Sequence, residues 1–351
     1  MTAATAPITW PDAAREARFH AWLAPLCQRF GFDAASLVPA SADASFRRYF
    51  RVRGSQGSFI VMDAPPPQED VRPFVDIASR IRAAGLHAPE VLAEDAEHGF
   101  LLLADLGTTL YLDALQTPAQ ADALMRDAVR ALVQFQQRVD PQGLPAYDTE
   151  LLQRELSLFE TWCVMQEYGH SWTPAQGRQW QRLCELLIGS AQAQPQVAVH
   201  RDWMPRNLMV TTPNPGILDF QDAVRGPVTY DIASLLRDAF ISWDEDRELD
   251  WAVRWWQQAR AAGLLAGHAM GEDFGECWRA LEWMGLQRHL KVLGIFCRLK
   301  HRDGKPRYSA DLPRFFGYVA RVATRYRELQ PLIGLIEPMT GALTTSAFTL
   351  R

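Results

Sequence analysis

The sequence predicts an α+β protein with a small, mostly antiparallel β-rich N-terminal lobe that contains a helix, and a large, mainly helical C-terminal lobe. A chain of 351 residues exceeds the usual size of one hydrophobic core, which favours two lobes. Short apolar runs between turn residues dominate up to residue 104, and helical periodicity dominates from residue 105 onward. We therefore predict an N-terminal lobe at 1–104 and a C-terminal lobe at 105–351.

The composition is that of an ordinary folded protein, with 48% hydrophobic and 22% charged residues. A net charge of -5 gives no electrostatic reason to expect a nucleic-acid partner. The N-terminus does not resemble a signal peptide and no long apolar run occurs, so we expect a cytoplasmic protein with no membrane partner and leave the oligomeric state open. The five scattered cysteines lack metal-site spacing and are expected to be reduced core thiols.

In the N-terminal lobe, two β-rich runs flank the turn GSQG and predict a hairpin over 48–63. Apolar residues at helical spacing then predict a helix that begins near Val71 and ends at Gly85. Two short strands, 90–93 and 100–104, follow. The second is apolar enough to be buried on both faces.

In the C-terminal lobe, Thr117 and Gln120 predict a capping box at the start of a helix. Further helical patterns lie at roughly 150–167, 174–193, 231–242, 246–263, 273–300 and 311–329. Three short strand-like runs interrupt them, at 196–199, 207–211 and 215–220. These runs predict a β-lined loop cluster inside the helical lobe.

The tripeptide His-Arg-Asp occurs twice, ending at Asp202 and at Asp303. Phosphoryl transfer of the protein kinase type needs a carboxylate near the attacking hydroxyl, an amide oxygen for Mg²⁺ and a second carboxylate on the metal. Asp202 is followed by Asn207 at the matching spacing, and Asp219 ends a strand-like run. The second copy has Tyr308 where the amide should be. We therefore interpret the first copy as the catalytic loop and the second as an exposed loop between helices.

The triplet Asp273-Phe274-Gly275 also spells a metal-binding motif of protein kinases. It lies far from the first loop and begins a long helical pattern, so we interpret Asp273 as a helix cap.

The loop residues have distinct predicted roles. Asp202 would orient the substrate hydroxyl and accept its proton, with a surface turn as the alternative. Asn207 and Asp219 would hold Mg²⁺, a hard cation that prefers oxygen ligands, and the alternative for Asn207 is again a turn residue. His200 is expected to brace the loop, because no second ligand stands at metal-site spacing.

These motifs resemble the aminoglycoside phosphotransferase and choline kinase superfamily, which has a bilobal protein kinase-like fold. The resemblance covers nearly the whole chain and includes Gly226-Pro227 and Tyr230-Asp231-Ile232-Ala233. It implies ATP and Mg²⁺ as cofactors and a bracing role for Asp231. It also implies a linker, formed by Leu103, Ala104 and Asp105, that meets the adenine through backbone groups. Leu102 would lie behind the base.

A narrower resemblance concerns the acceptor. The segments ASADASFRRYFRV, FIVMDAPP, ILDFQDAVRGPVTYDIASLLRD and QRHLKVLGIFCRL are similar to the anomeric kinases of bacterial cell-wall recycling. Those enzymes phosphorylate the C1 hydroxyl of N-acetylmuramate and N-acetylglucosamine. The resemblance therefore implies a small amino sugar as substrate.

Two departures from the family pattern concern the N-terminal lobe. Met62 stands where a strand lysine should pair with the phosphates. Arg47 and Arg48 are therefore the candidate cations. The alternative is that these arginines are surface residues of an exposed hairpin. The loop at 41–46, which would cover the nucleotide, lacks glycine, so its phosphate contacts would come from Ser45 or from backbone N–H groups.

Candidate sugar contacts lie on two helical faces and beside Asp219, although each has a structural alternative, and the aromatic ones favour the core. They are Glu155, Phe159 and Trp162, then Arg288, Lys291 and Arg298, and finally Gln221 and Asp222. The lactyl carboxylate of N-acetylmuramate would need a cation, for which Arg288 or Lys291 is our hypothesis.

Two rival functions remain open at this point. One is a kinase of another small alcohol or of an aminoglycoside. The other is a non-catalytic, pseudokinase-like nucleotide-binding module, which the missing strand lysine favours.

Overall fold

The computed structural model describes residues 8–42, 46–55 and 57–340. The chain forms two compact units, Met1–Ala114 with Arg206–Asp222 and Leu115–Pro205 with Ala223–Arg351. The first unit thus combines the N-terminal part of the chain with a segment from its middle.

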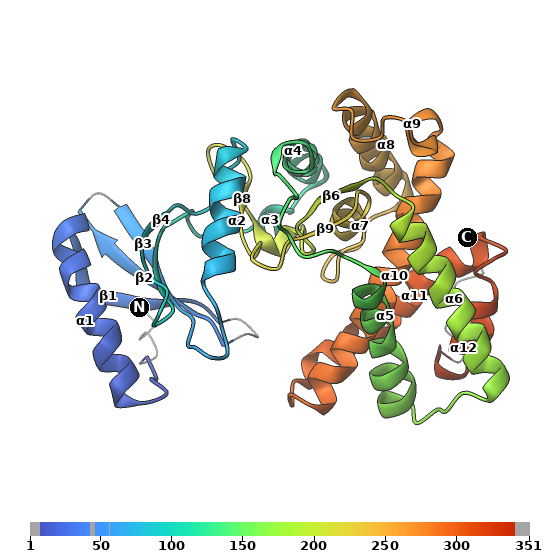
Figure 1. Ribbon diagram of the computed structural model, residues 1–351, viewed down its shortest axis with the longest axis horizontal. Coiled ribbons are helices and arrows are strands. Elements are labelled where there is room, and N and C mark those ends of the chain that lie inside the picture. The colour runs from blue at the N-terminus through green and yellow to red at the C-terminus, as the bar shows by residue number, and fades with distance from the viewer. Residues whose placement is uncertain (1–7, 43–45, 56, 341–351) are drawn as a thin grey trace. The chain divides into compact units, whose positions relative to one another are not determined.

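The first unit is built on a five-stranded antiparallel sheet in the order β1-β2-β3-β5-β4 (Figure 1). Its strands are β1 (Phe32–Ala42), β2 (Arg48–Gly54), β3 (Gly57–Asp63), β4 (Val91–Asp95) and β5 (Phe100–Ala104). The predicted hairpin is β2–β3, in which Tyr49 lies opposite Met62. Leu101, Leu102 and Leu103 in β5 are at most 2% exposed, as the apolar run predicted. Together with the helices, this sheet confirms the α+β fold class.

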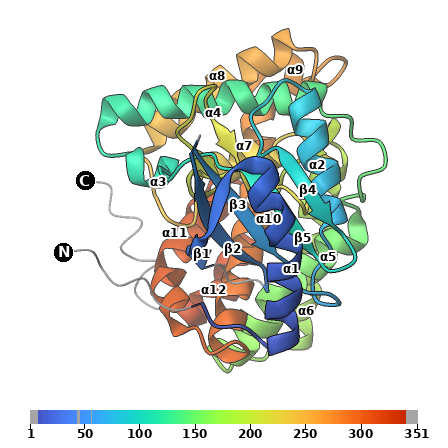
Figure 2. The same cartoon turned by 90° about the vertical axis from the view of Figure 1, so that its left-hand side faces the viewer.

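Helix α1 (Ala13–Phe30) lies across the strands in Figure 2. Its side chains Phe19 and Leu23 are buried against Phe50 and Phe100 of the sheet. This helix was not predicted from the sequence. Helix α2 (Arg72–Ala83) is the predicted one, and Gly85 follows it in the left-handed conformation.

The middle segment of the first unit contains η2 (Pro205–Asn207), which begins at the last residue of the other unit, and the strand pair β7 (Leu208–Met209) and β8 (Gly216–Ile217). Backbone hydrogen bonds attach it to two other parts of the first unit. The N–H of Val210 donates to Thr109, just before α3 (Tyr111–Ala114), at 2.9 Å, and that of Ile217 donates to His87, which follows α2, at 2.8 Å. The Phe220 ring packs on Phe74 of α2. These contacts fix both ends of the loop that precedes Asp219.

The second unit is organised around α10 (Phe274–His301) (Figure 1). Most residues of this helix are buried. Around it pack α5 (Thr149–Leu158), η1 (Phe159–Glu167), α6 (Pro174–Gln192), α7 (Tyr230–Leu236), α8 (Glu245–Ala261), α9 (Ala269–Glu272), η3 (Pro306–Asp311) and α11 (Leu312–Arg325). The remaining helices are α4 (Pro118–Arg138), which packs on α8, and α12 (Pro331–Thr340), which packs on α11. Strand β6 (Gln196–Val199), at its predicted position, pairs with β9 (Val224–Pro227).

Helix ends in the second unit follow their capping residues. Thr117 accepts the N–H of Gln120 as predicted, although the fully reciprocal capping box is formed by Thr173 and Gln176. The predicted helix at 231–242 was too long, because Arg237 leaves helical geometry and its buried side chain pairs with acidic residues of α8 and α10.

Two other predictions, for Asp273 and for the second His-Arg-Asp copy, are confirmed. Asp273 caps α10 by accepting the N–H of Gly275 at 2.6 Å. Arg302 to Gly304, from the second His-Arg-Asp copy, form an exposed connection between α10 and η3. The five cysteines are unbridged, and four of them are buried. Among the described helices, none is long and apolar enough to cross a membrane.

Candidate active site

The first His-Arg-Asp loop follows β6 in the second unit, where Asp231 of α7 holds its backbone. The fully buried Asp231 carboxylate accepts the N–H of His200 at 2.7 Å and that of Arg201 at 2.9 Å. Burial raises the pKa of Asp231 to about 7, against the effect of these two donors. His200 is buried too, and its Nδ1 accepts the N–H of Asp202 at 3.3 Å. Both side chains therefore hold the backbone that leads to Asp202.

The side chain of Arg201 forms an ion pair with Glu155 of α5 at 2.8 Å. Glu155 also pairs with Lys291 of α10 at 2.7 Å, and it accepts hydrogen bonds from the Tyr147 hydroxyl and the Gln287 amide. Burial would raise the pKa of Glu155, but the charges of Lys291 and Arg201 outweigh burial and lower the pKa to about 2. Two candidate sugar contacts, Glu155 and Lys291, thus pair with each other.

In the first unit, Asn207 and Asp219 lie together. The Asn207 amide nitrogen is 3.3 Å from Asp219 Oδ2, and the N–H of Leu218 donates to the Asn207 carbonyl at 2.9 Å. Gln221 donates its amide to Asp219 Oδ1 at 2.9 Å and also contacts Asp222. The predicted metal residues therefore share one local hydrogen-bond network with the two residues that follow them.

The backbone is unusual at two of these positions. Among the residues that the structure describes, Arg201 at φ 76° and Asp219 at φ 61° are the non-glycine residues with positive φ. This conformation is uncommon outside glycine and persists where the surrounding structure enforces it, as it often does at functional sites. The two positions lie beside Asp202 and at Asp219, the carboxylates that the sequence singles out.

The chemistry of Asn207 and Asp219 fits a magnesium ion. Mg²⁺ at bond lengths of about 2.1 Å places neighbouring octahedral ligands roughly 3 Å apart, close to the 3.3 Å between these side chains. Rotation of the Asn207 amide by half a turn would direct its oxygen to the same point as Asp219 Oδ2. Across the described part of the chain, no three His, Cys, Asp or Glu side chains gather as a dedicated metal cage. The pair therefore suits an ion that takes its other ligands from phosphate and water.

The two candidate phosphate cations differ in their surroundings. Arg47 pairs with Glu69 at 3.0 Å. Burial would lower its pKa, but the nearby Tyr49 and the carboxylates, including those of Asp219 and Asp222, raise it. Arg48 instead pairs with the fully buried Asp63, which also binds Arg15 of α1. Arg48 is thus held in a structural ion pair. Arg47, in contrast, interacts electrostatically with Asp219, one of the two predicted metal ligands. Ser45 lies outside the described residues.

The predicted adenine linker is partly engaged within the first unit. Leu102 and Leu103 are buried, and the Ala104 N–H donates to the Glu90 carbonyl at 2.9 Å. Asp105 accepts hydrogen bonds from Arg51 and Ser58, each at 2.6 Å. Its role as a nucleotide contact stays a prediction.

Of the remaining sugar candidates, Arg288 is 3% exposed, and its charge acts to lower the pKa of Asp231. Phe159 is fully buried and packs on Trp180, so it belongs to the core, the alternative that the sequence favoured. The sequence motifs did not point to Tyr147 or to the side chain of Arg201. Arg201 could have been found, because it lies inside the catalytic motif itself.

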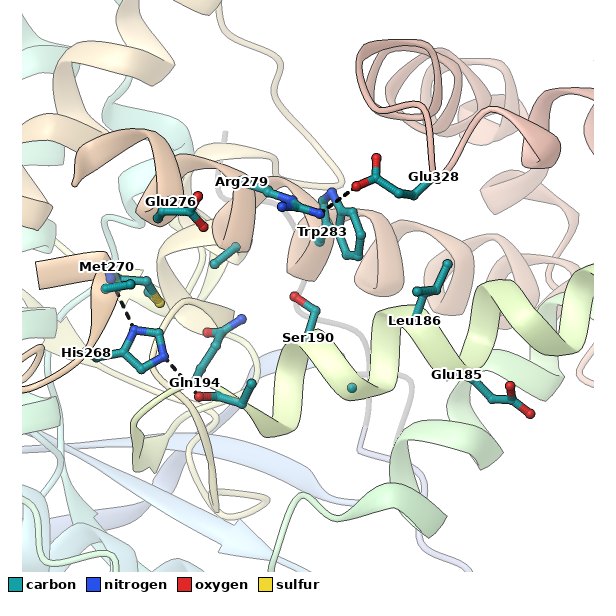
Figure 3. Close-up of a pocket in the computed structure, with 14 residues that line it drawn as sticks. Glu185, Leu186, Ser190, Gln194, His268, Met270, Glu276, Arg279, Trp283 and Glu328 are labelled. Atoms are coloured by element: carbon teal, nitrogen blue, oxygen red, sulfur yellow. Dashed lines mark hydrogen bonds and ion pairs between the residues drawn. The ribbon is translucent and has the colours of Figure 1, made fainter. Parts of the chain in front are cut away.

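A separate cavity of about 460 Å³ lies in the second unit between α6 and α9–α10 (Figure 3). Arg279 pairs with Glu328 at its rim at 2.8 Å, and His268 bonds the Ala193 carbonyl and the Met270 N–H. No residue of the predicted active site lines it. The cavity therefore does not bear on the catalytic assignment.

The chain belongs to the phosphotransferase enzyme family, whose sequence model matches residues 36–268. It is 56% identical over 310 residues to the N-acetylmuramate/N-acetylglucosamine kinase of Pseudomonas putida, covering 88% of this chain and 90% of that protein. It is 53% identical over 299 residues to the enzyme of the same name from Pseudomonas aeruginosa, covering 85% and 87%.

Solved structures bear on the fold. An aminoglycoside phosphotransferase crystallised with ADP matches with a TM-score of 0.52 at 13% identity, over 89% of this chain and 99% of that one. This likeness shows that the chain has the bilobal kinase-like fold of the phosphotransferases, as the sequence predicted.

Proposed function

We propose that this protein is an ATP- and Mg²⁺-dependent kinase of the anomeric C1 hydroxyl of N-acetylmuramate and N-acetylglucosamine, acting in the recycling of peptidoglycan sugars. The observation that carries this proposal is the 56% identity, over 88% of the chain, to a relative named for both sugars. The ADP bound to the aminoglycoside phosphotransferase of the same fold supports a nucleotide as the phosphoryl donor.

The chemistry is a direct in-line transfer. The C1 oxygen of the sugar attacks the γ-phosphorus, the bond from that phosphorus to the departing ADP oxygen breaks, and the hydroxyl proton passes to Asp202. The hydrogen bonds from His200 and Arg201 to Asp231 support this role, because they hold the loop backbone at a residue with positive φ.

Asn207 and Asp219 would hold the Mg²⁺ ion, which neutralises charge on the phosphates when it is bound. Arg47 is the cation that we assign to the phosphates in place of the missing strand lysine. Its electrostatic interaction with Asp219 and Asp222 supports a position near the metal. Arg48 is the weaker candidate because it is paired with buried Asp63.

The decisive assay measures ADP release with ATP and Mg²⁺ against a panel of N-acetylmuramate, N-acetylglucosamine, choline, homoserine and kanamycin. We expect turnover with the two amino sugars, and phosphorus NMR should show a phosphate on C1 of the product. Turnover restricted to kanamycin or to another alcohol would replace the proposed substrate. Nucleotide binding without turnover of any acceptor would favour the pseudokinase-like alternative, which the absence of a lysine on β3 suggests.

The two His-Arg-Asp copies offer a matched pair of variants. Asp202→Asn should lower kcat by about 10²- to 10⁴-fold, because the amide cannot accept the substrate proton. Asp303→Asn changes the same residue of the exposed copy and should leave kcat unchanged. Steady-state ADP release by the purified variants measures both, and equal activity of the two would contradict the assignment of the catalytic loop.

A further inference from the structure

We infer that Glu155 is a positioning residue that fixes the catalytic loop through the Arg201 side chain; this inference rests on the proposed kinase function. Arg201 directly precedes Asp202, so its backbone dihedrals set the direction in which Asp202 leaves the loop. The arginine is held at two points. Its N–H donates to Asp231, and its guanidinium pairs with Glu155 at 2.8 Å.

The left-handed backbone of Arg201 needs such restraint. A non-glycine residue at φ 76° relaxes to a more favourable conformation unless its surroundings prevent it. The Asp231 carboxylate restrains the peptide, but it leaves the long side chain unconstrained. Glu155 supplies the second restraint from α5, a different element, and the guanidinium lies 5.8 Å from the centre of the Tyr147 ring. Together they define one orientation of the residue.

The hydrogen bonds of Glu155 argue against a direct contact with the sugar. A carboxylate offers about four acceptor positions. Oε1 of Glu155 takes the cations of Arg201 and Lys291, and Oε2 takes the donors of Tyr147 and Gln287. The side chain is only 6% exposed. With its acceptor positions used inside the protein, Glu155 acts on the reaction through Arg201.

The test compares two buried carboxylates that each hold two cations. Glu155→Gln removes the charge that binds Arg201, and Glu248→Gln removes the one that binds Arg237 at 3.1 Å and Arg321 at 3.2 Å. Both variants should have a lower Tm than the wild type. At a temperature where both variants are folded, we expect Glu155→Gln to lower kcat about tenfold or more, while the KM values for ATP and sugar change little. Glu248→Gln should keep the wild-type kcat.

Other outcomes are informative. A raised sugar KM with unchanged kcat in Glu155→Gln would make Glu155 a sugar ligand and overturn the inference. An equal loss of kcat in both variants would overturn it too, since the effect would then be general destabilisation. If wild-type protein shows no sugar-dependent ADP release, the proposed function fails instead.

A second variant covers the case in which Glu155→Gln does not fold. Arg201→Met leaves Glu155 paired with Lys291, so the carboxylate keeps a counterion. It should lower kcat as much as Glu155→Gln does, and the double variant should be no worse than either single one, because both remove the same link. Full kcat in Arg201→Met would overturn the inference without reference to Glu155.

Discussion

Glu155 makes the stability of the protein depend on pH. Lys291 and Arg201 lower its pKa from the ordinary value of 4.5 to about 2, despite burial. A carboxylate whose pKa is depressed on folding stabilises the folded state above its unfolded pKa and loses this contribution as the pH falls through its folded pKa. The contribution is therefore complete at pH 7, roughly 3 kcal/mol by this linkage, and about 1 kcal/mol of it is lost by pH 4.

This linkage predicts how Glu155→Gln behaves in denaturant. The difference in unfolding free energy between wild type and variant should shrink by about 1 kcal/mol between pH 7 and pH 4. Urea titrations at the two pH values measure it. Glu150→Gln, at an exposed position of the same helix, is the control and should give a difference near zero at both. A Glu155→Gln difference that stays constant would show that the carboxylate is not held by its cations.

At the level of single residues, the sequence predicted those whose chemistry and spacing lie within one loop. Asp202 and Asn207 form a motif readable in one line of sequence, whereas the link from Glu155 to Arg201 joins residues 46 positions apart. Helical spacing placed Glu155 on a face with aromatic residues but could not say which side chain would meet it. Such long-range pairs depend on how helices pack, which local patterns do not encode.

Among the elements, the positions of strongly periodic helices were predicted well, but their type of helical hydrogen bonding was not. The helix pattern at 150–167 is present, but its second half, η1, is a π-helix. It begins next to Leu158, whose backbone α10 approaches closely at Gly294. Helix α1 was missed although Phe19, Leu23 and Leu26 stand at helical spacing, and β9 was missed because four residues with one proline carry little pattern.

The contact at Gly294 predicts opposite effects for the same substitution in two helices. A Cβ at Gly294 of α10 would lie 2.4 Å from the Leu158 carbonyl carbon, so Gly294→Ala must push α10 away from α5. Gly317 of α11 is exposed, and no neighbouring element lies within 4 Å of the point that an added Cβ would occupy. Gly317→Ala should therefore stabilise the protein by about 0.5–1 kcal/mol through helix propensity.

Thermal unfolding followed by circular dichroism separates the two cases. Gly294→Ala should lower Tm, with a cost of about 1–3 kcal/mol for overpacking, and Gly317→Ala should raise it slightly. A Gly294→Ala variant as stable as wild type would mean that the two helices can separate at no cost.

For the whole molecule, the chain order differs from the division into units. Arg206–Asp222, which carries Asn207 and Asp219, belongs to the first unit, and Asp202 belongs to the second. The strand-like runs at 207–211 and 215–220 were visible in the sequence. Their attachment to His87 and Thr109 was not, because it runs through backbone hydrogen bonds that any residue type can make. Periodicity therefore located the elements but not their partners.

The pairing of Asn207 with Asp219 predicts that the nucleotide stabilises the protein more strongly when Mg²⁺ is present. A ligand that binds the folded state alone stabilises it by about 2.7 kcal/mol at roughly 100 times its Kd. A nonhydrolysable ATP analogue should raise Tm more with Mg²⁺ than without it, because phosphate oxygens and the Asn207–Asp219 pair would complete one ligand shell. Asn207→Ala should remove the magnesium-dependent part of the rise.

Asn214→Ala supplies the control for this last variant. Asn214 lies in the turn between β7 and β8, where its side chain accepts the Thr211 N–H at 3.2 Å, so its loss removes an amide from the same segment. Differential scanning fluorimetry with and without Mg²⁺ should therefore show a full magnesium-dependent rise for Asn214→Ala. If Asn207→Ala keeps that rise as well, the ion is held by other groups, and the assignment of Asn207 as a metal ligand is wrong even where the kinase activity itself stands.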